Sequence, residues 1–253
     1  MKAKVYFTKE IAPEKVVEMY QALGVELPGK VAVKVHSGEK GNQNFLRPEF
    51  WRPMVEKVHG TIVECNTAYG DASGGVRDHT ESHRKLLEEH GWTKYFDVDL
   101  MDAEGPDVIW PIPNGKILKE NHLGKDIMNY DSMLVLVHFK GHPMGGYGGA
   151  LKQLAIGCAF RAGKALIHSG GKTDDRYETW DQHASKTAFP EAMADAASSV
   201  VEHFKGKIAF INVMKNLSVD CDCCAVAEDP CMKDIGILAS TDPVAIDQAV
   251  WIW

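Results

Sequence analysis

Four of the six cysteines fall close together, in the stretch NLSVDCDCCAVAEDPC at 216–231. Thiolates such as Cys221, Cys223, Cys224 and Cys231 are the usual ligands of structural zinc and of iron–sulfur clusters. Their spacing, C-x-C-C-x6-C, matches neither the bacterial ferredoxin run nor a pair of C-x2-C motifs. Adjacent side chains of an extended chain point apart, so Cys223 and Cys224 do not easily reach one metal. The stretch predicts a site that uses Cys221 and Cys223 together with partners from elsewhere.

The remaining ligands of such a site have several sources. Asp222 offers carboxylate oxygens between the two favoured cysteines, and Cys158 offers another thiolate. His138 or His142 can complete the set, because imidazole is a common zinc ligand. We therefore expect an iron–sulfur cluster or a single Fe or Zn ion with a redox or Lewis-acid role. The alternative is a loop of free thiols. Exposed free cysteines are a liability for a protein, because they react readily.

A second candidate site lies at 137–157, in VHFKGHPMGGYGGALKQLAIG, which has the pattern strand, loop, helix. Glycines let the backbone turn sharply and leave N–H groups unpaired where the helix begins, an arrangement that binds anions. His138, Lys140 and His142 stand at the mouth of the strand and His36 at the end of another, where they are candidate catalytic groups. The expected anion-binding set is Gly145, Gly146, Gly148, Gly149 and Lys152.

These two sites lead to three hypotheses about function. The first is a metal- or iron–sulfur-binding protein. The second is a metal-independent enzyme that binds a small anionic ligand in a crevice lined by the histidines and the glycine loop. The third is a non-catalytic binding or assembly module. Because the glycine spacing fits neither a P-loop nor a dinucleotide fingerprint, a turn that only lets strand and helix pack closely also stays open.

Composition limits the classes of binding partner and the cellular compartment that we expect. The 253 residues carry a formal net charge of -7 and no basic run, which favours neither nucleic acid nor an anionic membrane as partner. The apolar run at 132–139 is far too short to span a bilayer. The N-terminus turns charged after a few residues and has no signal-peptide core. We expect a cytoplasmic protein, and no protein partner can be named from the sequence.

Strand-like and helix-like segments alternate along the chain. Alternating or wholly apolar runs predict strands at 4–8, 30–37, 61–68, around 95–112, and at 132–142, 207–214 and 235–241. Helical spacing is found at 12–24, 47–60, 78–91, 149–164 and 191–206. Asp242-Pro243 is typical of the start of a last helix. The alternation predicts an α/β fold with a mostly parallel sheet and helices on both faces.

The same pattern suggests how the chain is organised around a site. We expect residues 1–253 to form a single domain with a polar, insertion-like segment at about 169–190, which would be the docking surface of a binding module. Whether two sub-domains flank a central crevice is left open. Ligands of parallel sheets gather at the carboxyl ends of the strands. Polar loops that should face one crevice follow four strands, at 35–42, 65–75, 138–149 and 216–224.

Four segments together resemble the family catalogued as domain of unknown function 362, often labelled iron–sulfur centre proteins. They are VKVHSGEKGNQNFLRPEF, HFKGHPMGGYGGALKQLAIGCAFRAGK, INVMKNLSVDCDCC and DIGILASTDPVAIDQA, in the family's order. The label rests on members with a ferredoxin-type C-x2-C-x2-C-x3-C-P insertion. This chain has no cysteine in the corresponding stretch, 168–190, so a cluster would have to use the DCDCC loop. The resemblance implies a fold similar to two-domain racemase-type proteins and implies no particular reaction.

Overall fold

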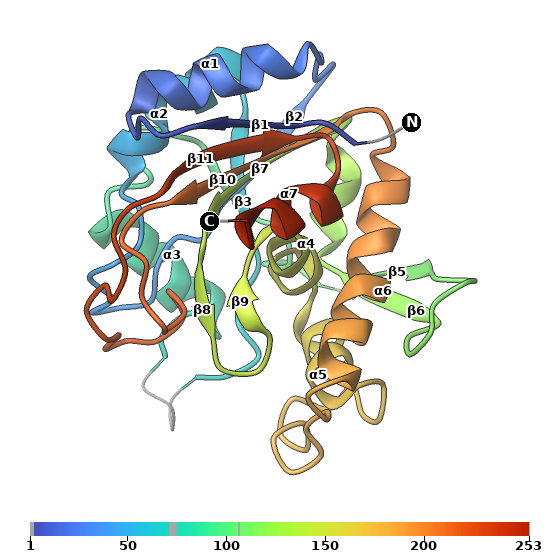
Figure 1. The fold of residues 1–253 in the computed structure, drawn as a ribbon. Coiled ribbons are helices and arrows are strands. Elements are labelled where there is room, and N and C mark those ends of the chain that lie inside the picture. Colours follow the sequence, from blue (N-terminus) through green and yellow to red (C-terminus); the bar gives the residue numbers. More distant parts are fainter. Residues whose placement is uncertain (1–2, 71–74, 106, 253) are drawn as a thin grey trace.

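The structure, a computed structural model, describes residues 3–70, 75–105 and 107–252. A seven-stranded sheet with the order β1-β11-β10-β7-β2-β3-β4 forms its centre (Figure 1). The strands are β1 (Val5–Thr8), β2 (Val31–Lys34), β3 (Thr61–Glu64), β4 (Val98–Leu100), β7 (Ser132–His138), β10 (Ile208–Met214) and β11 (Gly236–Ser240). Neighbours from β4 to β10 are parallel, whereas β11 is antiparallel to both β10 and β1. The predicted α/β fold with a mostly parallel sheet is confirmed.

Helices cover both faces of the sheet (Figure 1). One face carries α1 (Pro13–Leu23), α2 (Pro48–Val58) and α3 (Thr80–Glu89), and the other carries α4 (Ala150–Cys158), α5 (Arg161–Ser169), α6 (Ala188–His203) and α7 (Pro243–Val250). Successive residues of a strand point to opposite faces, so Met133 and Val135 enter the core under α4 and α6, while Leu134 and Leu136 enter the core under α1 and α2. No described helix has both the length and the apolar character needed to cross a membrane.

Small elements at the carboxyl end of the sheet differ from the sequence prediction. The run at 132–142 divides into β7 and β8 (Lys140–His142), and β8 forms a hairpin with β9 (Gly146–Gly148). A second hairpin joins β5 (Val108–Pro111) to β6 (Glu120–Leu123), followed by a short 3-10 helix, η2 (Lys125–Asn129). The sequence of β6, ENHL, is polar, which is why periodicity did not predict a strand there.

The helix predicted over 149–164 is two helices, α4 and α5, with a break at Ala159 and Phe160. At the break the Phe160 N–H donates to the His122 carbonyl at 2.9 Å, and Ala159 bridges to Leu123. A Cβ at Gly163 would lie 2.1 Å from the same His122 carbonyl oxygen, so only glycine allows this approach. Pairing with β6, which comes from elsewhere in the chain, therefore breaks the helix.

The polar segment at 169–190 connects α5 to α6 and folds back against the body. The Ala184 N–H donates to the His168 carbonyl at 2.7 Å, and Thr179 is buried. Arg176 Nη2 lies 3.1 Å from Asp78 Oδ2. These contacts place the middle of the segment beside the carboxyl ends of the strands.

The C-terminal helix α7 fixes the start of α4. The buried Asp247 carboxylate accepts the N–H groups of Ala150 (2.7 Å) and Leu151 (3.0 Å) and the Asn212 side-chain amide (2.9 Å). A Cβ at Gly149 would lie 2.4 Å from Asp247 Oδ1, which explains the glycine. A carboxylate at a helix N-terminus satisfies unpaired N–H groups and the helix dipole, so Asp247 acts as a cap supplied by another helix.

Replacing Asp247 by alanine should lower the free energy of unfolding by about 2–4 kcal/mol, because buried donors on α4 and on Asn212 lose their acceptor. Urea denaturation followed by circular dichroism measures the change. Asp229, an exposed residue, is the control, and its alanine variant should stay within about 0.5 kcal/mol of the wild type. Equal effects of the two substitutions would contradict the capping role.

Candidate functional site

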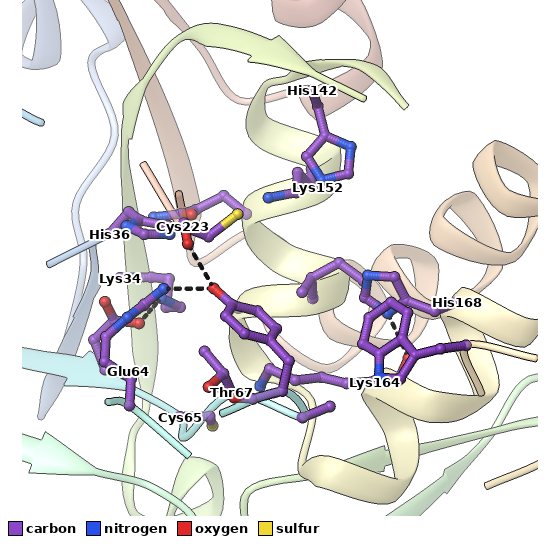
Figure 2. A pocket seen from close by; sticks show the side chains of 17 residues that line it. Lys34, His36, Glu64, Cys65, Thr67, His142, Lys152, Lys164, His168 and Cys223 are labelled. Carbon is purple, nitrogen blue, oxygen red and sulfur yellow. Dashed lines mark hydrogen bonds and ion pairs between the residues drawn. The ribbon is translucent and has the colours of Figure 1, made fainter. Parts of the chain in front are cut away.

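A pocket lies at the carboxyl ends of β2, β3, β7 and β10, which are neighbours in the sheet, and α4 and α5 form its far wall (Figure 2). Its enclosed space is about 60 Å³, enough for a few water molecules or for the charged group of a small ligand. The polar and aromatic side chains that line it are Lys34, His36, Glu64, Cys65, Thr67, Tyr69, Arg77, His142, Lys152, Gln153, Lys164, His168, Trp180 and Cys223.

Two of the cations in the wall are neutralised by buried carboxylates. Lys34 Nζ lies 2.8 Å from Glu64 Oε2, and Arg77 Nε lies 3.1 Å from Glu39 Oε2. Burial alone would raise the pKa of Glu64, but Lys34 and Arg77 outweigh it and hold that pKa at about 2. Glu64 is therefore ionised at neutral pH, and in each pair the carboxylate lies against the cation that it balances.

Two further lysines of the wall have no such partner. Lys152 Nζ lies 3.3 Å from Cys221 Sγ, and the buried Lys164 donates to the Ala159 carbonyl. Within the described part of the chain, neither forms an ion pair with a carboxylate. Burial lowers the pKa of Lys164, because desolvation disfavours the ammonium more than the nearby Cys65 and Asp102 favour it. A ligand carboxylate or phosphate would supply the missing counter-charge.

Hydrogen bonds determine the tautomers of three pocket histidines. His36 Nδ1 accepts the backbone N–H two residues further on (3.1 Å), and His142 Nδ1 accepts that of Gly145 (3.0 Å). In the neutral ring the proton of both residues is therefore on Nε2. His168 is the reverse case: its Nδ1 lies 2.7 Å from the Lys164 carbonyl oxygen, which can only accept. Its proton is on Nδ1, and Nε2 keeps a lone pair.

The surroundings keep all three rings neutral. Burial, followed by the charge of Lys152, lowers the pKa of His142 to about 2. Burial lowers the pKa of His168 to about 4, and burial with Arg77 lowers the pKa of His36 well below its ordinary value. At neutral pH the pocket therefore contains two imidazole N–H donors and one imidazole acceptor.

Aromatic contacts orient two of these rings. Phe189 of α6 stacks on His142, with ring centroids 5.9 Å apart and an interplanar angle of 12°. The same phenyl ring lies 5.1 Å from the His168 ring, and Trp180 packs on His168 at 5.4 Å. Phe189 thus holds the two histidines on one wall of the pocket. Trp180 comes from the 169–190 segment, so that segment helps to close the pocket.

Two residues predicted to be catalytic, His138 and Lys140, form a buried ion cluster with Asp222 instead. Asp222 Oδ2 lies 2.9 Å from His138 Nδ1 and 3.0 Å from Lys140 Nζ, and His138 Nε2 lies 2.6 Å from the Lys215 carbonyl. Burial opposes ionisation of Asp222, but His138 and Lys140 hold its pKa well below the usual range. Carboxylate and carbonyl both accept, so both His138 nitrogens donate and neither is free to move a proton.

The predicted metal ligands do not meet at one point. Asp222 is committed to its two cations, and Cys158 is buried on the inner side of α4 near Cys65. Cys221 lies against Lys152 and Cys223. Across the described residues, no three or more His, Cys, Asp or Glu side chains are placed to hold a metal ion. The set Cys221, Cys223, Cys158 and Asp222 expected from the spacing is therefore not assembled.

The glycine-rich loop also differs from the prediction. Gly145 donates its N–H to His142, Gly146 and Gly148 belong to the hairpin strand β9, and Gly149 packs on the Asp247 carboxylate. The Gly145 N–H is thus already paired within the protein, and Asp247 occupies the start of the helix that follows the loop. Lys152 is the one member of the expected anion-binding set found among the described lining residues.

Several lining residues were not singled out from the sequence. Lys34 ends a strand that is otherwise apolar, and Glu64 ends the next strand along the chain, so no motif marks either residue. Lys164 and His168 are four residues apart on α5 and therefore share a helix face, a signal that the sequence does contain. Part of the loop at 65–75, residues 71–74, lies outside the described residues.

The fold and the pocket define an α/β protein with a cationic, histidine-lined site at the strand ends. Residues 31–251 match the model of the family described as Domain of unknown function (DUF362), and the chain belongs to this family. No curated protein matches the chain.

Two solved structures share the fold. The lactate racemase apoprotein from Thermoanaerobacterium thermosaccharolyticum has a TM-score of 0.50 and 9% identity, with 97% of this chain and 56% of that chain covered. A protein from Thermotoga maritima has a TM-score of 0.50 and 11% identity, with 98% and 60% covered. The chain spans less than two thirds of either structure, and similarity at this identity concerns the fold alone.

The Lys34–Glu64 pair predicts a specific pH dependence. The pKa of Glu64 is about 2 in the folded protein against an ordinary 4.5, so its contribution to stability is present above pH 4.5 and is lost as the pH falls toward 2. The pH-dependent part of the advantage of wild type over Glu64→Gln should be about 3 kcal/mol at pH 7, and it should fall to somewhat less than half of that by pH 3.

Urea midpoints of both proteins at pH 7, 5, 4 and 3 measure this difference. Glu202→Gln is the matched control, because Glu202 is exposed and pairs with the exposed Lys205. A Glu64→Gln difference that does not change with pH would show that Glu64 is not held ionised by its neighbours.

Proposed function

We propose that this chain is an enzyme that binds a small carboxylate- or phosphate-bearing substrate in the pocket and transfers a proton to or from it. One observation carries the proposal: two lysines, to which the described residues offer no carboxylate partner, line the same small pocket as neutral histidines of opposite tautomer. The lysines suit the substrate anion, and the histidines suit the proton transfer. This corresponds to the metal-independent alternative raised by the sequence.

Lys152 and Lys164 would hold the anionic group of the substrate. They come from different helices, α4 and α5, and lie on separate parts of the pocket wall (Figure 2), so either could meet an anionic group of a bound substrate. Anion binding would also relieve the desolvation of Lys164 and restore its pKa toward the ordinary value. Recognition and the protonation of the lysine are therefore coupled in the proposed complex.

His168 and His142 would take part in the proton transfer. With a lone pair on Nε2, His168 can accept a proton from a bound substrate, and the Nε2–H of the neutral His142 can donate a hydrogen bond to the substrate oxygen that gains negative charge. A base and a hydrogen-bond donor in one pocket suit isomerisation, epimerisation or racemisation, in which the base removes a proton and later returns it. The shared fold of a structure titled as a lactate racemase apoprotein supports small 2-hydroxy acids as the first substrates to test.

The other two hypotheses have less support. The donors predicted for a metal or an iron–sulfur cluster are divided between an ion cluster, the inner side of α4 and the pocket rim, so we derive no step through a metal. The 169–190 segment, considered as a docking surface, contributes Trp180 to the pocket and buries Thr179. Its contacts favour a role in closing the site.

Removing either lysine should weaken anion binding. Calorimetric titration of the purified chain with lactate and with inorganic phosphate should show at least about tenfold weaker binding for Lys152→Met and Lys164→Met, the cost of one charge-assisted hydrogen bond. Lys205→Met is the control, since Lys205 is exposed, pairs with the exposed Glu202 and does not line the pocket. Unchanged affinity in both pocket variants would place the anion elsewhere.

Proton transfer can be measured without knowing the physiological substrate. Incubation with lactate and other small 2-hydroxy acids in deuterated water, followed by proton NMR, should show loss of the C2 proton signal. His168→Gln should slow this exchange by about 100-fold or more, since general acid–base groups contribute that much. The exposed His183→Gln is the matched control. Exchange that survives the loss of His168 would remove it from the proposed mechanism.

A further inference from the structure

The turn formed by Cys221, Asp222, Cys223 and Cys224 has no part in the proposed proton transfer. The Cys224 N–H donates to the Cys221 carbonyl at 2.9 Å, which closes a four-residue turn with a cysteine at each end. Ends of such a turn have Cα atoms within about 7 Å, and a disulfide requires Cα atoms about 4.4–6.8 Å apart. C-x-x-C is also a spacing at which thiols become reactive.

Long-range contacts hold this turn in place. The Asp222 carboxylate is fixed by two buried cations. The carbonyl oxygens of the second, third and fourth turn residues accept from the Glu39 N–H (2.8 Å), the Tyr69 hydroxyl (3.0 Å) and the Asn42 side-chain amide (2.9 Å). The backbone that brings the two end cysteines together is therefore formed before any bond between them. Little additional ordering is required when that bond is made.

The cysteines of the turn differ in access and in surroundings. Cys224 is partly exposed, whereas Cys221 is fully buried beside the Lys152 ammonium. The Cys223 thiol hydrogen-bonds to the Cys224 sulfur, which lowers the pKa of Cys224, whereas the hydrogen bond with Cys223 and burial raise the pKa of Cys221. Cys224 is thus the thiol that solvent reaches and that ionises first, and Cys221 is the resolving thiol behind it.

We propose that Cys221 and Cys224 form a redox-active pair that is oxidised to a disulfide by low-molecular-weight disulfides. The Cys224 thiolate attacks one sulfur of the small disulfide and releases one thiolate, which takes up the proton that Cys224 lost. Cys221 then attacks the sulfur of Cys224, and the second small thiol leaves with the proton of Cys221. Two protein thiols are oxidised, and one small disulfide is reduced to two thiols.

Cys223 is not the resolving partner in this proposal. Its side chain lines the substrate pocket, and a disulfide between the adjacent Cys223 and Cys224 would have to bridge a single peptide unit, which strains the geometry. Because Cys221 accepts a hydrogen bond from Lys152, the pair lies directly behind a lysine of the pocket. The redox site is thus distinct from the proton-transfer site but in contact with it.

The test exposes the full-length, reduced chain to glutathione disulfide, alkylates the remaining thiols and determines intact and peptide masses. The wild type should lose two hydrogen atoms and gain an internal disulfide within the turn. Cys223→Ser should behave the same way. Cys221→Ser should stop at a stable glutathione adduct on Cys224, and Cys224→Ser should form neither adduct nor disulfide in the turn. Cys231→Ser, at an exposed cysteine outside the turn, is the matched control and should keep the disulfide.

The proposal is overturned if Cys223→Ser abolishes the disulfide, if Cys221→Ser retains it, or if glutathione reacts at Cys231 while the turn stays reduced. Circular dichroism confirms that each variant is folded. Should Cys221→Ser fail to fold, Cys221→Ala replaces it, because alanine places no polar group in the buried position. The experiment depends on no substrate, so its failure would leave the proton-transfer proposal untouched.

Discussion

The ion cluster of Asp222, His138 and Lys140 determines how the carboxyl end of the sheet is built. Three buried charges are costly to desolvate, and their attraction repays that cost only in a well-formed geometry. The cluster joins the end of β7 to the loop after β10, two segments that are distant in the sequence and adjacent in the sheet. It thereby sets the position of the cysteine turn, and through Cys223 one side of the pocket.

Charge pairing separates the parts of the site that support structure from the parts available for chemistry. Glu64 and Glu39 neutralise Lys34 and Arg77 within the wall, so these four groups are satisfied without a ligand. The two lysines on α4 and α5 are the exception, and the histidines near them are kept neutral by burial and by that same positive charge. An excess of cations beside neutral imidazoles favours anion binding and proton transfer over a purely structural role.

Periodicity predicted the large elements because each strand and helix has a consistent apolar pattern, as in the runs that became β7 and β10. Periodicity did not predict features that depend on contacts with distant segments. The break between α4 and α5 is an example, because pairing with β6 causes it. Candidate residues at strand ends were identified by type, but their partners were not. His138 was predicted to be catalytic and Asp222 to bind a metal, but in the fold the two side chains pair with each other. Lys164 and His168, which lie on α5, were not predicted as site residues.

Asp247 limits how the proposed substrate anion could be recognised. The N-terminus of α4 is the natural place for a ligand anion, and the fold fills it with a carboxylate from α7. In the proposed complex the substrate anion would then rely on Lys152, in the first turn of that helix, and on Lys164 from α5. Backbone N–H groups cannot lose their affinity for anions, whereas a buried lysine can lose its proton. Binding through Lys164 therefore depends on its protonation, which the burial of the pocket controls.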